Sequence, residues 1–148
     1  MQEPHQSPKG EPLIRTIAMP ADANPSGDIF GGWLMAQMDL TAANAAARRA
    51  RGRCVTAAVD GMVFHHPVFV GDEVSLYAEI VRVGRTSLTI RVEAWRRSPI
   101  EIAMQKVTEA TFTFVAINGN RKPRPVFPEG AYETNVESEK DRRPTDHA

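Results

Sequence analysis

The sequence has one cysteine, no surplus of either charge and no long run of apolar residues. Cys54 alone cannot form a disulfide within the chain, so we expect a reducing compartment and a cytoplasmic protein. The 18 basic and 18 acidic residues cancel, so the basic surplus typical of a nucleic-acid-binding domain is missing. No segment reaches the roughly 18 apolar residues of a membrane span, and the polar N-terminus does not resemble a signal peptide. The composition therefore predicts that neither nucleic acid nor membrane is a partner.

The chain has room for one domain with a sizeable core. An Ala-, Leu- and Met-rich segment predicts a helix from Gly32 to Ala50, with Gly52 as the residue that ends it. Runs of β-branched and aromatic residues predict strands around this helix, over residues 13–19, 55–64, 73–83, 87–95 and 103–117.

The order of these elements, β-α-β-β-β-β, predicts an α+β domain over residues 12–126. Short turns separate the last four strands, which favours antiparallel pairing, and one helix is best buried by a sheet that curls around it. Polar, Pro-containing segments at residues 1–11 and 127–148 are predicted to be a flexible N-terminal tail and a disordered C-terminal tail.

Asp39 breaks the pattern of the predicted helix. At 100° per residue, four polar positions gather within about 60° of the helix circumference, and Asp39 lies roughly opposite, among alanines and methionines. The polar positions are Gln37, Thr41, Asn44 and Arg48. Such a break is typical of functional sites, so Asp39 is a candidate general base. The alternative is a buried structural carboxylate paired with an arginine or with backbone amides.

The start of the helix is a second candidate. Gly31 and Gly32 leave open an end where backbone N–H groups have no partner within the helix, which suits an oxyanion hole for acyl transfer. A tight turn that requires glycine is the alternative. Asn24, in the preceding loop, either orients a water molecule or stabilises a turn.

One long motif carries a family resemblance. The segment Thr16–Asp39, with its motif N-x-x-G-D-I-F-G-G-W-x-M-x-x-M-D, closely resembles the YciA-like branch of the hotdog-fold acyl-CoA thioesterases. Shorter matches follow along residues 13–126, namely Val55–Thr56, Phe64, Pro67, Val70–Asp72, Val83–Ser87, Thr108–Ala110 and Phe112–Val115. The helix after Asp39 is richer in Ala and Arg than this branch leads us to expect, which leaves the acyl-chain preference open.

The resemblance implies a hotdog fold, a homodimer that assembles further into a hexamer, and hydrolysis of acyl-CoA to a free acid and coenzyme A. It implies that Asp39 is the catalytic carboxylate, that Gly32 supplies an oxyanion N–H, and that Asn24 faces Asp39 across a dimer interface. It also places the CoA phosphates near a strand turn, and we take Gly31, Val59, Arg82, Gly84, Arg85, Thr86 and Ser87 as candidate residues for substrate and CoA binding. No metal or cofactor is expected, because CoA is part of the substrate.

Other residues have simpler interpretations. His65 and His66 are adjacent in a strand and would point to opposite faces, which argues against one shared metal. Cys54 is expected to be a small buried side chain. Arg121, Lys122 and Arg124 are expected to be solvated, with phosphate contact as the alternative, while Phe30, Trp33 and Met35 suggest a tunnel for a medium or long acyl chain. Two other functions remain open: a CoA-binding hotdog protein without turnover, and an enoyl-thioester hydratase.

Overall fold

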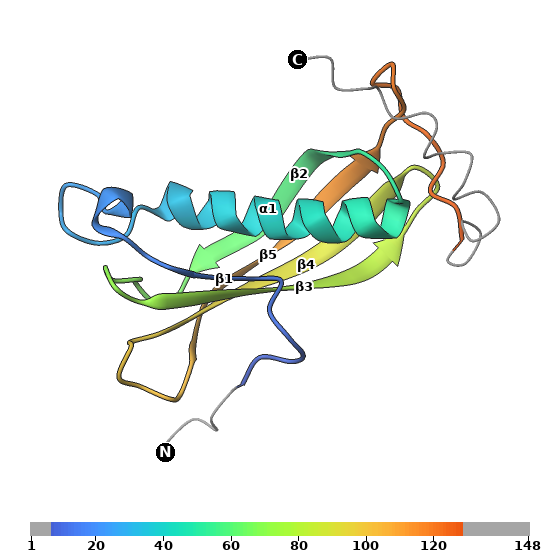
Figure 1. Ribbon diagram of the computed structural model, residues 1–148. Coiled ribbons are helices and arrows are strands. Elements are labelled where there is room, and N and C mark those ends of the chain that lie inside the picture. Colours follow the sequence, from blue (N-terminus) through green and yellow to red (C-terminus); the bar gives the residue numbers. More distant parts are fainter. Residues whose placement is uncertain (1–6, 129–148) are drawn as a thin grey trace, which may run out of the picture.

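The computed structural model describes residues 7–128. Most of the tails predicted at residues 1–11 and 127–148 therefore lies outside the described residues. One long helix, α1, lies across the concave side of a single curled sheet (Figure 1). The elements are β1 (Ile14–Ile17), a 3-10 turn η1 (Pro20–Asp22), α1 (Gly31–Ala50), β2 (Cys54–Phe64), β3 (Glu73–Val83), β4 (Ser87–Arg97) and β5 (Gln105–Ala116). The predicted order is therefore confirmed, and the boundaries differ from the expected ones by at most three residues.

The five strands form one antiparallel sheet in the order β1-β3-β4-β5-β2. Alternation along each strand sends one set of side chains toward α1 and the other to the opposite face. The set toward α1 is apolar and includes Leu88, Ile90, Phe112 and Phe114, all fully or almost fully buried. This arrangement, a sheet curled around one helix, is the predicted hotdog fold.

The face of α1 that packs on the sheet consists of small and medium-sized side chains. Its buried residues are Leu34, Met38, Thr41, Ala42, Ala46 and Ala50. The alanines let the C-terminal half of the helix approach the sheet closely. Thr41 was expected on the polar stripe but is fully buried, and its hydroxyl donates to the Gln37 carbonyl (2.8 Å). The hydroxyl therefore keeps a partner inside the core.

The chain after β5 returns over the C-terminal end of α1. The Val126 N–H donates to the Arg85 carbonyl (2.7 Å), and Val126 itself is buried. Arg124 reaches the Ala50 carbonyl with its guanidinium (2.7 Å). The end of the helix is thus covered by a segment almost eighty residues away in sequence.

The helix ends at Ala50, as predicted. The left-handed residue after α1 is Arg51 (φ 54°), and the predicted stop, Gly52, follows it. A Cβ at Gly52 would lie 2.5 Å from the Arg124 guanidinium, so a larger residue there would displace this side chain. Within residues 7–128, α1 is not apolar enough to cross a membrane, and neither is any other helix.

Candidate active site

Asp39 lies in the middle of α1, on the side that faces β2. The Thr56 hydroxyl on β2 donates a hydrogen bond to Asp39 Oδ1 (2.6 Å). Thr56 points toward the helix because it pairs with Phe114, whose side chain belongs to the core. The hydrogen bond holds one carboxylate oxygen and leaves the other available to a substrate or a water molecule.

Asp39 is half-exposed in the single chain, not buried among alanines as the helix pattern suggested. The angular arrangement was predicted correctly, but the sheet covers the arc between the polar stripe and Asp39. The covered arc includes Leu34 and Thr41, and Asp39 is left at its edge beside β2. The periodicity of a helix shows which residues share a face, and packing decides which face is buried.

The start of α1 is open. Phe30 occupies the N-cap position without a side-chain hydrogen bond, and the Gly31 and Gly32 N–H groups have no acceptor among residues 7–128. A Cβ at Gly32 would lie 2.3 Å from the Phe30 ring, so a larger residue here would displace that ring. These two donors at the positive end of a 20-residue helix can stabilise an oxyanion.

Asn24 organises the loop that leads into α1. Its side-chain oxygen accepts hydrogen bonds from the N–H groups of Ser26 (2.9 Å) and Asp28 (3.2 Å). The loop is further fixed by the Phe30 N–H, which donates to the Asp22 carbonyl (2.8 Å). Within the described part of the chain the Asn24 amide nitrogen has no partner, so it remains available as a donor.

Within one chain, the helix start and Asp39 are too far apart to act on the same carbonyl. Eight residues separate Gly31 from Asp39, which corresponds to about 12 Å along the helix axis. Asp39 faces β2, the strand that carries its partner Thr56. Among residues 7–128, β2 is an outer strand of the sheet that pairs with β5 alone, so its other edge is open. The structure therefore divides the predicted catalytic residues into two groups.

The residues predicted to bind CoA lie in a third region, with two exceptions. Gly31 is at the start of α1, and Val59 is on β2 and is 40% exposed. The turn Gly84–Ser87 joins β3 to β4 and is closed by the Gly84 N–H, which donates to the Ser87 carbonyl (2.8 Å). Arg82 and Arg85 are exposed there. This end of the molecule also carries exposed cations from α1 and the returning segment, namely Arg48, Arg51, Arg53, Arg121 and Lys122.

No carboxylate interrupts this basic region in the sequence. Residues 40–59, 80–88 and 110–128 contain neither Asp nor Glu. The segments are neighbours in space, because the Ala116 N–H donates to the Thr86 carbonyl (2.9 Å) and the Ile117 N–H to the Arg53 carbonyl (3.0 Å). The region is therefore electropositive and suits phosphate groups.

Three other residues follow their simpler interpretations. His65 and His66 are both exposed in the loop after β2, and residues 7–128 contain no group of three or more potential metal ligands. Burial raises the pKa of the Cys54 thiol, and the charge of nearby Arg124 offsets only part of this rise. A protonated thiol is a poor nucleophile, so Cys54 contributes by packing.

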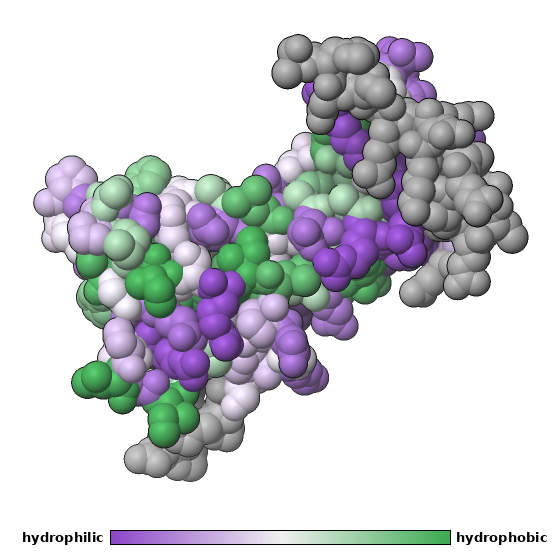
Figure 2. All heavy atoms as spheres, in the orientation of Figure 1, coloured by the Kyte–Doolittle hydropathy of each residue, from purple (hydrophilic) through white to green (hydrophobic). Residues whose placement is uncertain are grey.

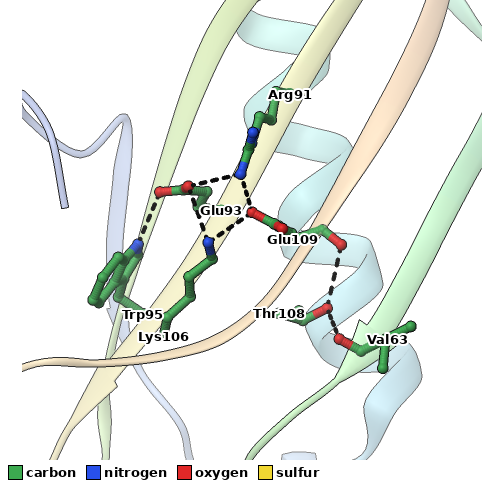
Figure 3. A network of polar contacts seen from close by, with 7 residues as sticks. All are labelled: Val63, Arg91, Glu93, Trp95, Lys106, Thr108 and Glu109. Atoms are coloured by element: carbon green, nitrogen blue, oxygen red, sulfur yellow. Dashed lines mark hydrogen bonds and ion pairs between the residues drawn. The ribbon is translucent and has the colours of Figure 1, made fainter. Parts of the chain in front are cut away.

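A cavity of about 370 Å³ lies on the opposite face of the sheet from Asp39. Its lining includes Tyr77, Glu79 and Trp95. A network of side chains occupies this face (Figure 3): Lys106 contacts Glu109 (2.7 Å) and Glu93 (3.4 Å), and Arg91 also pairs with Glu109.

In this network the hydrogen bond from Lys106, together with that from Arg91, lowers the pKa of Glu109. The Trp95 indole N–H also donates to Glu93 (3.2 Å). The two cations and the two carboxylates balance each other in charge, and we interpret this network as a structural feature, not a second active site.

Thr56 is the residue whose role was missed at the level of sequence. It belongs to a short segment that resembles the thioesterase family, but that match assigned it no function. The available signal was a hydroxyl at a position of the strand that faces the helix. That position became recognisable only once the register of β2 against β5 was known.

The fold and the site together define a hotdog-fold protein with the groups required for acyl transfer. A family model described as the thioesterase superfamily matches residues 26–103, and the chain belongs to this superfamily. The acyl-CoA thioester hydrolase YciA of Salmonella typhimurium is 48% identical over 127 residues, which cover 84% of this chain and 96% of that protein. YciA of Escherichia coli K12 is 47% identical with the same coverage of both chains.

Two solved structures are similar along most of the chain. A hexameric thioesterase from Yersinia pestis matches with a TM-score of 0.78 and 48% identity, over 82% of this chain and 99% of that one. A hexameric broad-specificity acyl-coenzyme A thioesterase matches with a TM-score of 0.78 and 44% identity, over 91% of this chain and 90% of that one.

Proposed function

We propose that this protein hydrolyses acyl-CoA thioesters to a free carboxylic acid and coenzyme A. The observation that carries the proposal is the pairing of Asp39 with Thr56 on the open side of the helix, together with the open helix start. Its relatives named as acyl-CoA thioester hydrolases share nearly half of its residues. We also propose that it acts in the cytoplasm.

In the proposed reaction, Asp39 takes a proton from a water molecule as that water attacks the thioester carbonyl. The Thr56 hydroxyl holds the carboxylate in place. The Gly32 N–H, with that of Gly31, stabilises the oxyanion, and Asn24 orients the water or the carbonyl. Collapse of the intermediate releases the CoA thiolate, and this chemistry needs neither a metal nor a redox cofactor. A variant of this mechanism uses Asp39 as a nucleophile that forms a mixed anhydride.

We propose that the CoA phosphates bind at the basic end of the molecule, near Arg82 and the turn formed by Gly84, Arg85, Thr86 and Ser87. Val59 lies on β2 between this end and the helix start, in position to contact the pantetheine arm. The support for this assignment is the run of exposed cations in segments that contain no carboxylate within residues 7–128.

The proposed active site is shared between two chains. We propose a two-fold dimer in which the open edges of two β2 strands pair and the helix start of one chain lies near Asp39 of the other. The two-fold axis would then form two equivalent sites. Such dimers would be the building blocks of a hexamer, the assembly named for two of the similar structures.

The decisive test is Asp39→Asn with an acyl-CoA panel and a thiol-release readout. We expect CoA affinity and fold to remain and kcat to fall by roughly 10²–10⁴, the usual contribution of a general base. Thr56→Val should lower kcat about tenfold by removing one hydrogen bond to a charged group, and Thr56→Ser should restore it. An Asp39→Asn enzyme with more than a third of wild-type kcat would exclude Asp39 as the base.

The same assay separates the other functions. A hydratase would alter enoyl-CoA without releasing thiol, and a CoA-binding protein would bind without either change.

Mixing of two variants tests the shared site. Asn24→Ala and Asp39→Asn chains, unfolded together and refolded, form mixed dimers in which one site carries both defects and the other carries neither. Equal amounts give about a quarter intact sites by random pairing, so activity should return to about a quarter of wild type when each variant alone is nearly inactive. No recovery, with chain exchange verified by mass, would assign both residues to a site within one chain.

A further inference from the structure

The loop between β4 and β5, residues 98–104, exposes two large apolar side chains. Ile100 is 93% exposed and Ile102 is 91% exposed. Among residues 7–128 the next most exposed large apolar side chain, Val63, is 59% exposed. The loop projects from the sheet on the side away from α1 (Figure 1), and the surface there is apolar at its tip (Figure 2).

This exposure is built into the loop by hydrogen bonds. The Glu101 N–H donates to the Ser98 carbonyl (3.1 Å), and the Ile100 N–H donates to the Ser98 hydroxyl (3.3 Å). The Arg97 guanidinium donates to the Ile102 carbonyl (3.3 Å) and also pairs with Glu73 on β3 (2.8 Å). The turn is thus fixed to the sheet in a shape that presents both isoleucines to solvent.

The charges beside the loop argue against an anionic membrane surface as its partner. Arg96 is bound by Asp72 through two hydrogen bonds (2.6 and 3.1 Å), and Arg97 is bound by Glu73. Glu101 lies between the two isoleucines. A membrane-binding loop combines apolar residues with free cations, and here the neighbouring cations already have carboxylate partners.

A second copy of the same chain fits better. The two similar structures described above are hexamers, and six copies cannot be closed by a single two-fold contact, because that contact ends at a dimer. The proposed dimer contact uses the edge of β2. The loop connects β4 to β5 and belongs to neither edge strand, so the pairing of two β2 strands does not use it.

We propose that the β4–β5 loop joins one dimer to the next, with Ile100 and Ile102 buried against a chain of the neighbouring dimer. This proposal rests on the proposed dimer but not on the proposed reaction. It separates two kinds of interface: β2 completes the active site, and the loop determines how many dimers assemble.

The test is the mass of the full-length protein in solution, measured by native mass spectrometry and by light scattering after gel filtration. Wild type is expected at the mass of six chains, and the double variant Ile100→Ser/Ile102→Ser at the mass of two. Because both side chains are more than 90% exposed, the variant is expected to fold. The matched control, Ile100→Val/Ile102→Val, keeps the apolar surface and should remain hexameric.

Thiol release by the serine variant keeps this proposal separate from the proposed function. Activity that persists in a two-chain assembly supports the assignment of the loop to the contact between dimers. A serine variant that stays hexameric overturns the proposal, and one that falls to single chains would place the loop in the dimer contact instead. Sedimentation of wild type with anionic phospholipid vesicles, lost in a serine variant that is still hexameric, would assign the loop to a lipid surface and overturn the proposal.

Discussion

The two ends of α1 differ in whether their terminal backbone groups have hydrogen-bond partners. At its C-terminal end, the Arg124 guanidinium donates to the Ala50 carbonyl, Arg49 donates to the Phe127 carbonyl, and the Arg51 N–H donates to the Ala47 carbonyl. At its N-terminal end, the N-cap residue Phe30 offers no side-chain cap, and the first two N–H groups have no acceptor within residues 7–128.

The difference shows where the fold keeps capacity for a ligand. Every helix leaves four N–H and four C=O groups without partners inside the helix, and these groups need other partners or solvent. This chain uses a distant segment to satisfy carbonyls at the closed end. At the open end, the Gly31 and Gly32 N–H groups keep no acceptor within residues 7–128. The oxyanion of a transition state would become their acceptor.

Among changes at the two ends of the helix, the largest expected effect comes from a substitution at the open end. In Gly32→Ala the added methyl group would lie 2.3 Å from the Phe30 ring, so the ring must move across the helix start. We expect kcat to fall by about 10², the usual contribution of one oxyanion donor, with little change in melting temperature. Thiol release and thermal unfolding are measured on the same samples.

The matched control is Gly119→Ala, because a Cβ there meets nothing within 4 Å. It should leave both measurements unchanged. Unaltered kcat in Gly32→Ala would show that the helix start does not contact the reacting carbonyl.

Opening the closed end should affect stability and not chemistry. Arg124→Met removes the charged donor to the Ala50 carbonyl, which should lower the free energy of unfolding by about 1.5–3 kcal/mol. Urea denaturation measures this loss, and kcat should stay within twofold of wild type. Lys122→Met, at an exposed position, should change stability by less than about 0.5 kcal/mol. A change in kcat of more than twofold would mean that the closed end takes part in the reaction.

Glycine substitutions at the closed end sharpen the comparison through their sign. Arg51 has a left-handed backbone (φ 54°), a conformation that costs an L-residue about 1 kcal/mol and glycine nothing. Arg51→Gly should therefore stabilise the protein by about 0.5 kcal/mol, after the entropy of glycine in the unfolded chain is subtracted. Arg48→Gly, inside the helix, should destabilise it by about 1 kcal/mol. If thermal denaturation shows that both variants change the stability in the same direction, this account of how the helix ends is contradicted.

The smallest expected effect lies away from both ends, in the network around Glu109. Its lowered pKa means that the stability it contributes is present above the unfolded pKa, near 4.3, and is lost as the pH falls toward the folded value. The contribution is about 0.5 kcal/mol, because the group is partly exposed. The melting temperature of Glu109→Gln should therefore be below that of wild type at pH 7 and approach it at pH 3. A constant difference at both pH values would contradict this account.

Much of the fold could be predicted because local patterns were strong. The helix over residues 31–50 and the strands around it follow from periodicity and turn residues, which depend on neighbours in sequence. The burial of Thr41 and the exposure of Asp39 could not be predicted, because they depend on which arc of the helix the sheet covers. The contact between Gly52 and Arg124 could not be predicted either, since Arg124 lies 72 residues away.

The sequence by itself determined the order of elements, the candidate residues Asp39, Gly32 and Asn24, and the family resemblance, because each is written in residues close together along the chain. Only the tertiary structure decided that Thr56 holds Asp39, that β2 lies at an edge of the sheet, and that one end of the helix is closed. These properties depend on the strand register and on packing between distant segments, and such long-range contacts have no signature in a short stretch of sequence.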